Sequence, residues 1–170
     1  MPLNLIKRYN QLLDIVGLSP IQRNQSLRGI FNRDIQDNPK FFFNGKPIYP
    51  TPKENGQEAM ESLFTHLTCR EANKDTHHRE FELSRSQRLH WIRFLVDRGK
   101  HDGMYIFSVA EPKGNRTYIY DDNEHYLIVL EPLRKVEAYY LLTAYPLEGR
   151  DLAKNKIIGK YNRRRLPYLL

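Results

Sequence analysis

Four short runs of strand-forming residues constrain the fold of this chain more than any other feature. They cover residues 104–110, 116–121, 126–131 and 138–145. The segments between them are short and rich in turn-forming residues, namely residues 112–115, 121–123 and 132–137. A parallel pair of strands needs a crossover of a dozen or more residues, and these segments are shorter. The sequence therefore predicts an antiparallel meander of four strands.

The meander is flanked by two predicted helices, an apolar one at residues 84–96 and a last one at about residues 150–160. This order predicts an α+β fold in which a helix packs on a four-stranded antiparallel sheet. We expect this unit to occupy residues 77–170.

Residues 1–76 are predicted to form a mostly helical extension. The apolar spacing predicts a first helix from Leu3 that ends at Gly17, and Ser19-Pro20 opens a second helix that runs to Asp37. Three other segments are predicted, namely a hairpin at Asn44-Gly45, a helix at residues 57–67 and a polar loop at residues 69–79.

The composition excludes several classes of protein. A chain of 170 residues with 40% hydrophobic and 28% charged residues can build the core of one domain with a small appendage. Its apolar runs, such as residues 127–130, are far short of the roughly 20 residues that span a bilayer. The first eight residues do not follow the order of a signal peptide, and the single Cys69 has no partner for an internal disulfide. We therefore expect a cytoplasmic protein that does not enter a membrane.

Most of the net charge of +7 lies near the end of the chain. Residues 150–165 contain seven Lys and Arg residues against Asp151 alone, which is a net +6. Such a patch attracts polyanions, nucleic acid first among them, through counterion release. The alternative is a solvated helix end that keeps the protein in solution.

A narrow polar seam interrupts the apolar helix predicted at residues 84–96. Ser86, His90, Arg93 and Asp97 follow one another at spacings of four, three and four residues. The seam is either a solvent-facing stripe with an Arg93–Asp97 ion pair or the lining of a cleft. In a cleft, His90 could carry a proton and Arg93 could bind a phosphate.

The predicted strands also carry polar side chains. Alternation places Arg116, Tyr118 and Tyr120 on one face, and Leu127, Val129 and Glu131 on one face. In the last strand it groups Tyr139 and Leu141 with Thr143 and Tyr145. These groups could bind a phosphate and stack bases. The alternative is that tyrosine and threonine are ordinary strand formers.

Motifs for metals and cofactors are missing. The chain has no CxxC pair, HExxH, Walker loop, GxGxxG or GxSxG motif, and the adjacent His77 and His78 would point apart on regular structure. We therefore expect no metal and no cofactor.

Five segments, taken in order, resemble a known family. They are residues 77–93, 116–121, 126–134 and 139–146, and the basic tail to Pro167. Together they resemble the phage-associated nuclease group of the barnase–EndoU–colicin–RelE superfamily, over about residues 77–167. The resemblance implies a helix packed on a four-stranded antiparallel sheet and a metal-independent, toxin-like ribonuclease activity.

The resemblance also implies working residues, at His90, Arg93, Arg116, Tyr118 and Thr143, with Glu131 and Arg134 as further candidates. Cleavage by attack of the ribose 2′-OH needs a base, an acid and cations on the phosphate. We expect His90 to transfer one proton and Glu131 or a tyrosine the other. Arg93 and Arg116 would stabilise the transition state, and Thr143 would place the phosphate.

The substrate RNA would be bound by basic side chains in and near the tail, at Arg134, Lys154, Lys156, Lys160, Arg163 and Arg164. A basic toxin also implies an acidic antitoxin or immunity protein as a partner. Two alternatives stay open, a non-catalytic nucleic-acid-binding module and an interaction protein of a phage or mobile element.

Overall fold

The computed structural model describes residues 2–52, 58–150, 156–164 and 169–170. Its main element is a mixed sheet with the strand order β1-β2-β8-β7-β6-β5. The strands are β1 (Phe42–Phe43), β2 (Lys46–Pro50), β5 (Met104–Glu111), β6 (Gly114–Asp121), β7 (Tyr126–Pro132) and β8 (Tyr139–Pro146). The prediction of an α+β fold is confirmed, and β5 to β8 pair antiparallel in sequence order.

The predicted sheet of four strands is incomplete, because the N-terminal hairpin extends it to six. Asn44 and Gly45 adopt positive φ angles of 52° and 74°, which fit the tight turn between β1 and β2. β2 then pairs parallel with β8, with Ile48 opposite Tyr139. The long stretch of chain between β2 and β8 permits this parallel pairing.

The helices differ in part from the prediction. They are α1 (Pro2–Leu5), α2 (Pro20–Phe31), the π-helix η1 (Asn32–Gln36), α3 (Ala59–Thr68), α4 (Leu83–Ser86), α5 (Trp91–Val96) and α7 (Lys156–Asn162). α2 begins as predicted, with Ser19 as N-cap in a capping box with Gln22. The helix predicted from Leu3 to Gly17 is wrong beyond Leu5. The Asn4 side chain instead binds both backbone groups of Asp14, and the Leu13 amide donates to the Gln87 carbonyl.

The single helix predicted at residues 84–96 is also wrong, because α4 and α5 are separated by turns at residues 87–90. At the break the Ser86 hydroxyl donates to the Thr68 carbonyl oxygen at 2.9 Å. The following amides bond back three residues rather than four, for example Leu89 to Ser86 at 3.2 Å. A contact with α3 therefore overrides the helical period.

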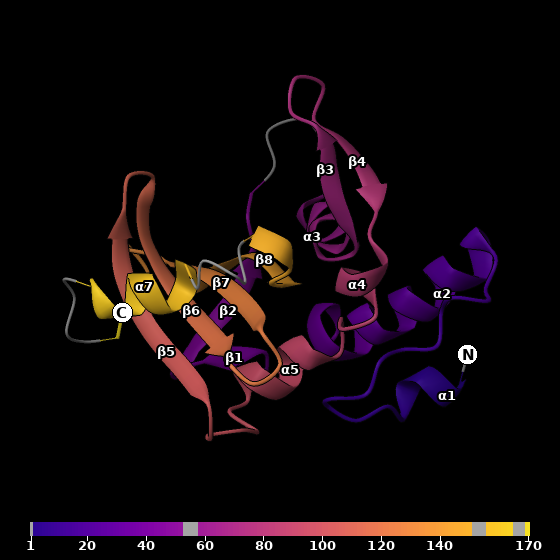
Figure 1. Ribbon diagram of the computed structural model, residues 1–170, viewed down its shortest axis with the longest axis horizontal. Coiled ribbons are helices and arrows are strands. Elements are labelled where there is room, and N and C mark those ends of the chain that lie inside the picture. Colours follow the sequence, from indigo (N-terminus) through magenta and orange to yellow (C-terminus); the bar gives the residue numbers. More distant parts are fainter. Residues whose placement is uncertain (1, 53–57, 151–155, 165–168) are drawn as a thin grey trace.

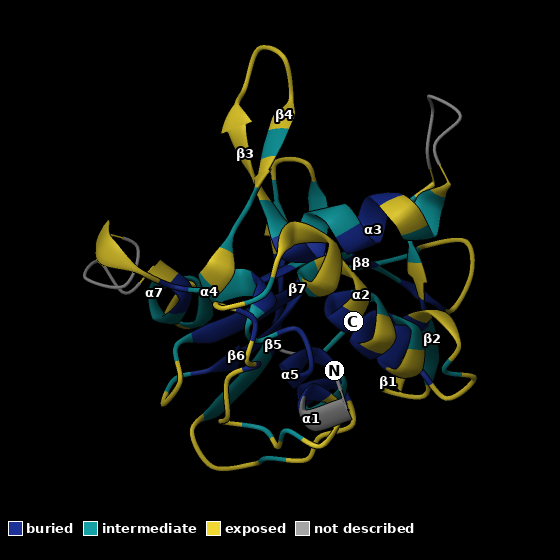
Figure 2. Cartoon of the chain, turned by 90° about the vertical axis from the view of Figure 1, so that its right-hand side faces the viewer, coloured by how far each residue is buried: buried dark blue, intermediate teal, exposed yellow. Residues whose placement is uncertain are grey.

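The loop predicted at residues 69–79 is wrong as well. This stretch is part of a second, two-stranded sheet, β3 (Cys69–Asn73) and β4 (His78–Phe81), which protrudes from the molecule with exposed strands (Figures 1 and 2). The turn uses Asn73, whose side chain accepts from the amides of Asp75 and Thr76. Apart from Phe81 at its base, which packs against the core, this hairpin buries no apolar side chain of the larger cluster, so its sequence lacks the alternation that predicts strands.

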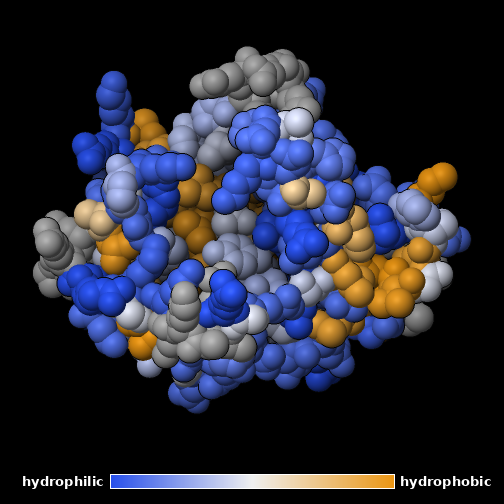
Figure 3. Space-filling view, turned by 45° about the horizontal axis from the view of Figure 1, so that its top comes forward, coloured by the Kyte–Doolittle hydropathy of each residue, from blue (hydrophilic) through white to orange (hydrophobic). Residues whose placement is uncertain are grey.

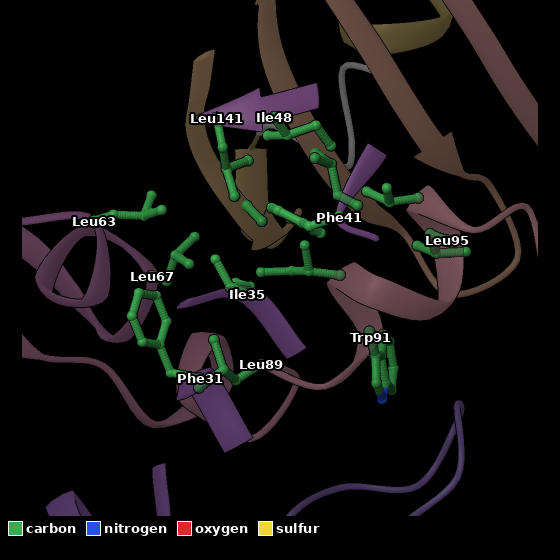
Figure 4. Close-up of a cluster of buried hydrophobic side chains, with 14 of the residues drawn as sticks. Phe31, Ile35, Phe41, Ile48, Leu63, Leu67, Leu89, Trp91, Leu95 and Leu141 are labelled. Carbon is green, nitrogen blue, oxygen red and sulfur yellow. The ribbon is translucent and has the colours of Figure 1, made fainter. Parts of the chain in front are cut away.

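Two hydrophobic clusters cover the two faces of the main sheet. The larger lies between the sheet and the N-terminal helices and α5, and includes Phe31, Leu67, Leu89, Trp91 and Leu141 (Figure 4). The smaller lies under α7 and includes Phe107, Tyr118, Tyr120, Leu127 and Ile157. The residues before 77 thus supply two strands of the main sheet and part of its core. No helix in the described ranges combines the length and hydropathy that crossing a membrane requires.

Candidate functional site

The structure places Arg116, Tyr118, Glu131 and Thr143 on one face of the main sheet. Tyr118 on β6 stands opposite Val129 on β7, and Val129 stands opposite Thr143 on β8. A register shift after Val129 places Leu130 opposite Leu141, so Tyr139 and Leu141 face the larger core instead. The predicted grouping of those two residues with Thr143 is therefore wrong, because a β-bulge reverses the alternation.

Arg116 and Glu131 form a loose ion pair on this face. Their Nη1 and Oε2 atoms are 3.9 Å apart, and the side chains are 15% and 33% exposed. Nη1 of Arg116 also donates to the Asn115 carbonyl oxygen at 2.8 Å. A distance of 3.9 Å is longer than a hydrogen bond. A bound phosphate could therefore replace Glu131 as the partner of the guanidinium, and Glu131 could then accept a proton.

A hydrogen-bonded triad lies beside this pair. Lys160 on α7 donates to Glu111 Oε1 at 2.5 Å and to the Tyr118 hydroxyl at 3.2 Å, and that hydroxyl donates to Glu111 at 2.9 Å. Burial raises the pKa of Tyr118. Burial opposes the charge on Lys160 and Glu111, but their hydrogen bonds outweigh it, so the pKa of Lys160 is raised and that of Glu111 is lowered. At neutral pH the lysine and glutamate are charged and the tyrosine is neutral.

Arg85 on α4 reaches the same face from the opposite side. Its Nη1 is 3.5 Å from the Thr143 hydroxyl and donates to the carbonyl oxygens of His66 and Cys69. Its guanidinium carbon is 5.3 Å from the centroid of the Tyr145 ring. The sequence pattern did not indicate Arg85 as a site residue, because its contact Thr143 is 58 residues away in the sequence.

The molecule is hollowed on the side that Figure 3 shows. Hydrophobic and weakly polar residues lie at the bottom of the hollow, and hydrophilic residues surround it. In Figure 1, β6, β7 and β8 lie between α7 and the elements α4, β3 and β4. We refer to Arg116, Tyr118, Glu131, Thr143 and Lys160 as the sheet-face site.

His90 and Arg93 do not join the sheet-face site. His90 immediately precedes α5, whose Trp91 and Ile92 pack in the cluster on the other face of the sheet. Its Nε2 donates to the Arg8 carbonyl oxygen at 2.8 Å, and burial lowers its pKa. Arg93 lies 3.6 Å from the carboxylates of both Asp34 and Asp97. The residues predicted to form one catalytic set are therefore divided between two sites.

The predicted RNA-binding residues lie mostly at the surface. Arg134 is exposed in the loop between β7 and β8, and Lys156 and Arg163 are exposed on and just after α7. Arg164 donates to the Tyr161 carbonyl oxygen at 2.6 Å and stacks over that ring. Lys154 lies outside the described residues.

Potential metal ligands are scattered. In the described part of the chain, no group of three or more His, Cys, Asp or Glu side chains could hold a metal ion.

Comparisons with known proteins identified no relative of this chain. No family model, no curated protein and no solved structure matches the chain. The relation to the nuclease group therefore stays a prediction from the residues.

Proposed function

We propose that this protein is a metal-independent endoribonuclease that acts at the sheet-face site. The observation that supports the proposal is the loose Arg116–Glu131 pair beside the Tyr118–Lys160 contact on one face of the main sheet. These groups offer a proton acceptor, a proton donor and two cations, which phosphodiester cleavage without a metal requires.

Each group has a role in the proposed reaction. Glu131 accepts the proton of a ribose 2′-OH as its oxygen attacks the phosphorus, and the bond from phosphorus to the 5′-oxygen breaks. The Tyr118 hydroxyl turns from Glu111 and gives its proton to the departing oxygen, and the Lys160 ammonium, 3.2 Å away, stabilises the phenolate. Arg116 neutralises the charge that develops on the phosphoryl oxygens. Solvent then returns a proton to Tyr118 and removes one from Glu131.

Substrate binding would use the cations around the site. Arg85 and the Thr143 hydroxyl, 3.5 Å apart, can hold a phosphate together at one side of the site. Lys156, Arg163 and Arg164 would bind the backbone at the other side, near α7. A site of this charge also fits an acidic antitoxin or immunity protein, and expression with and without such a partner would test for growth arrest.

The decisive experiment compares two RNA oligonucleotides of the same sequence in excess EDTA. One is all-ribose, and the other carries 2′-deoxyribose on the 5′ side of each phosphate that is cleaved. We expect the first to give products ending in a 2′,3′-cyclic phosphate and the second to stay intact. Equal cleavage of both would exclude attack by the 2′-OH. Binding of both without cleavage would support the non-catalytic module instead.

A further inference from the structure

A second basic site lies on the other face of the sheet. The structure holds a cleft of about 660 Å³ between the segment of residues 7–10, η1 and α5. Lys7, Arg8, Arg33 and Arg93 bring four positive charges to its lining, against Asp34 and Asp97. We propose that this cleft binds a small phosphate monoester such as a mononucleotide. Its volume lies within the range typical of small-molecule sites, about 300–1,000 Å³.

The wall formed by residues 7–10 is held in place before any ligand binds. The Tyr9 hydroxyl donates to the buried carboxylate of Asp121, which also accepts from Lys100 at 2.8 Å. The Tyr9 ring stacks on Phe94 with 4.6 Å between centroids and 10° between planes. A ligand therefore meets a preformed cleft and does not have to order the segment.

The four cations are not equally engaged. Arg33 holds Asp34 with two hydrogen bonds of 2.7 and 3.2 Å, and Lys7 pairs with Asp14 at 3.0 Å. Arg93 contacts its two carboxylates only at 3.6 Å, longer than a hydrogen bond, and its side chain is 43% exposed. Among the described residues, the Arg8 guanidinium has no hydrogen bond or ion pair. Arg8 and Arg93 are thus the two groups ready to bind a phosphate.

His90 indicates which kind of phosphate fits. Its Nε2 faces the Arg8 carbonyl oxygen and so carries a proton. Its Nδ1 is buried and lacks a hydrogen-bond partner in the described ranges, although His90 is one of the residues that line the cleft. A phosphate monoester has a second pKa of about 6, so one proton can be shared between its oxygen and Nδ1 near neutral pH. A phosphodiester has no such proton, which makes the monoester the better ligand.

The test measures binding without RNA and does not depend on the proposed ribonuclease activity. Isothermal titration calorimetry would be run with adenosine 5′-monophosphate, inorganic phosphate and adenosine. We expect the first two to bind saturably and adenosine not to bind. Arg93→Ala and Arg8→Ala should each weaken binding at least tenfold. Arg98→Ala is the matched control, because Arg98 is exposed and lies over the Phe43 ring, outside the cleft.

Three results would overturn the proposal. They are no saturable binding of the two phosphate ligands, equal weakening by the control variant, and equal binding of adenosine. Equal affinity for a dinucleoside phosphodiester would refute the preference for a monoester. Chemical-shift changes in the NMR spectrum of the 15N-labelled full chain should center on residues 7–10 and α5. Changes confined to α7 would place the anion at the sheet-face site and refute the second site.

Discussion

The Arg116 guanidinium and the Glu131 carboxylate face each other across β6 and β7, with 3.9 Å between Nη1 and Oε2. A pair this long contributes little to stability, since even surface ion pairs within about 4 Å have a median contribution of only about 0–1 kcal/mol. The same looseness allows the two groups to act separately, the arginine on a phosphate and the glutamate on a proton.

Replacing Glu131 by glutamine should separate function from folding. If Glu131 is the base, Glu131→Gln should lower the single-turnover rate of RNA cleavage by about 10²–10⁴-fold. Its midpoint in urea should stay close to that of the wild type, because only a loose pair is lost. Glu137→Gln, an exposed glutamate in the next loop, is the control and should cleave at the normal rate. A normal rate for Glu131→Gln would remove this residue from the mechanism.

The Tyr118 hydroxyl can be removed without changing the ring. Tyr118→Phe keeps the packing of the ring against Phe107 but loses the hydrogen bonds to Glu111 and Lys160. We expect cleavage to fall by at least tenfold and stability to fall by about 1 kcal/mol. Tyr105→Phe is the control. Tyr105 lies on the same face, and its ring contacts the ring of Tyr161. An unchanged cleavage rate in Tyr118→Phe would show that another group protonates the leaving oxygen.

The Lys160–Glu111 contact should make the free energy of unfolding fall at acidic pH. The pKa of Glu111 is lowered from its ordinary value of 4.5, despite burial, by hydrogen bonds from Lys160 and Tyr118. The unfolded chain therefore binds a proton at higher pH than the folded one, and this stabilisation is lost as the pH falls below about 4.5. Urea unfolding between pH 6 and pH 3 should show a shallower decline for Glu111→Gln than for the wild type. Parallel declines would contradict the lowered pKa.

Asp121 is the buried anchor of the N-terminal segment. It is fully buried and accepts from Tyr9, Lys100 and two backbone amides. Asp121→Asn leaves Lys100 without its carboxylate, so we expect a loss of about 3–5 kcal/mol in the free energy of unfolding. Tyr9→Phe keeps the stacking on Phe94 and should cost only about 1–2 kcal/mol. Equal losses of stability in the two variants would show that the Tyr9 hydroxyl, and not the charge of the Asp121 carboxylate, anchors the segment.

The sequence predicted the meander because turn length alone decides between parallel and antiparallel neighbours. Alternation correctly placed Arg116 and Tyr118 together, since the side-chain period of a regular strand is fixed. It failed in β8, because the bulge after Val129 is set by pairing with β7 and leaves no local signature.

The sequence could not show that His90 lies apart from Arg116. The polar seam assumes one helix with a constant period, and the Ser86–Thr68 hydrogen bond breaks that helix just before His90. Glu111 was missed because its partner Lys160 is 49 residues away. Charge density alone suggested Lys160 as an RNA-binding residue, which stays a prediction, and it did not indicate the triad that Lys160 completes.

The proposed monoester cleft makes a prediction about charge competition. Asp97 lies 3.6 Å from Arg93 Nε and is half exposed, so it competes with a phosphate for the same guanidinium. Asp97→Asn should therefore tighten the binding of adenosine 5′-monophosphate severalfold. Folding should change little, because an i,i+4 pair of this kind contributes only about 0.3–0.5 kcal/mol. Asp102→Asn, an exposed aspartate outside the cleft, removes the same charge and controls for the long-range effect. Equal tightening in both variants would mean that net charge, and not the Arg93 guanidinium, determines the affinity.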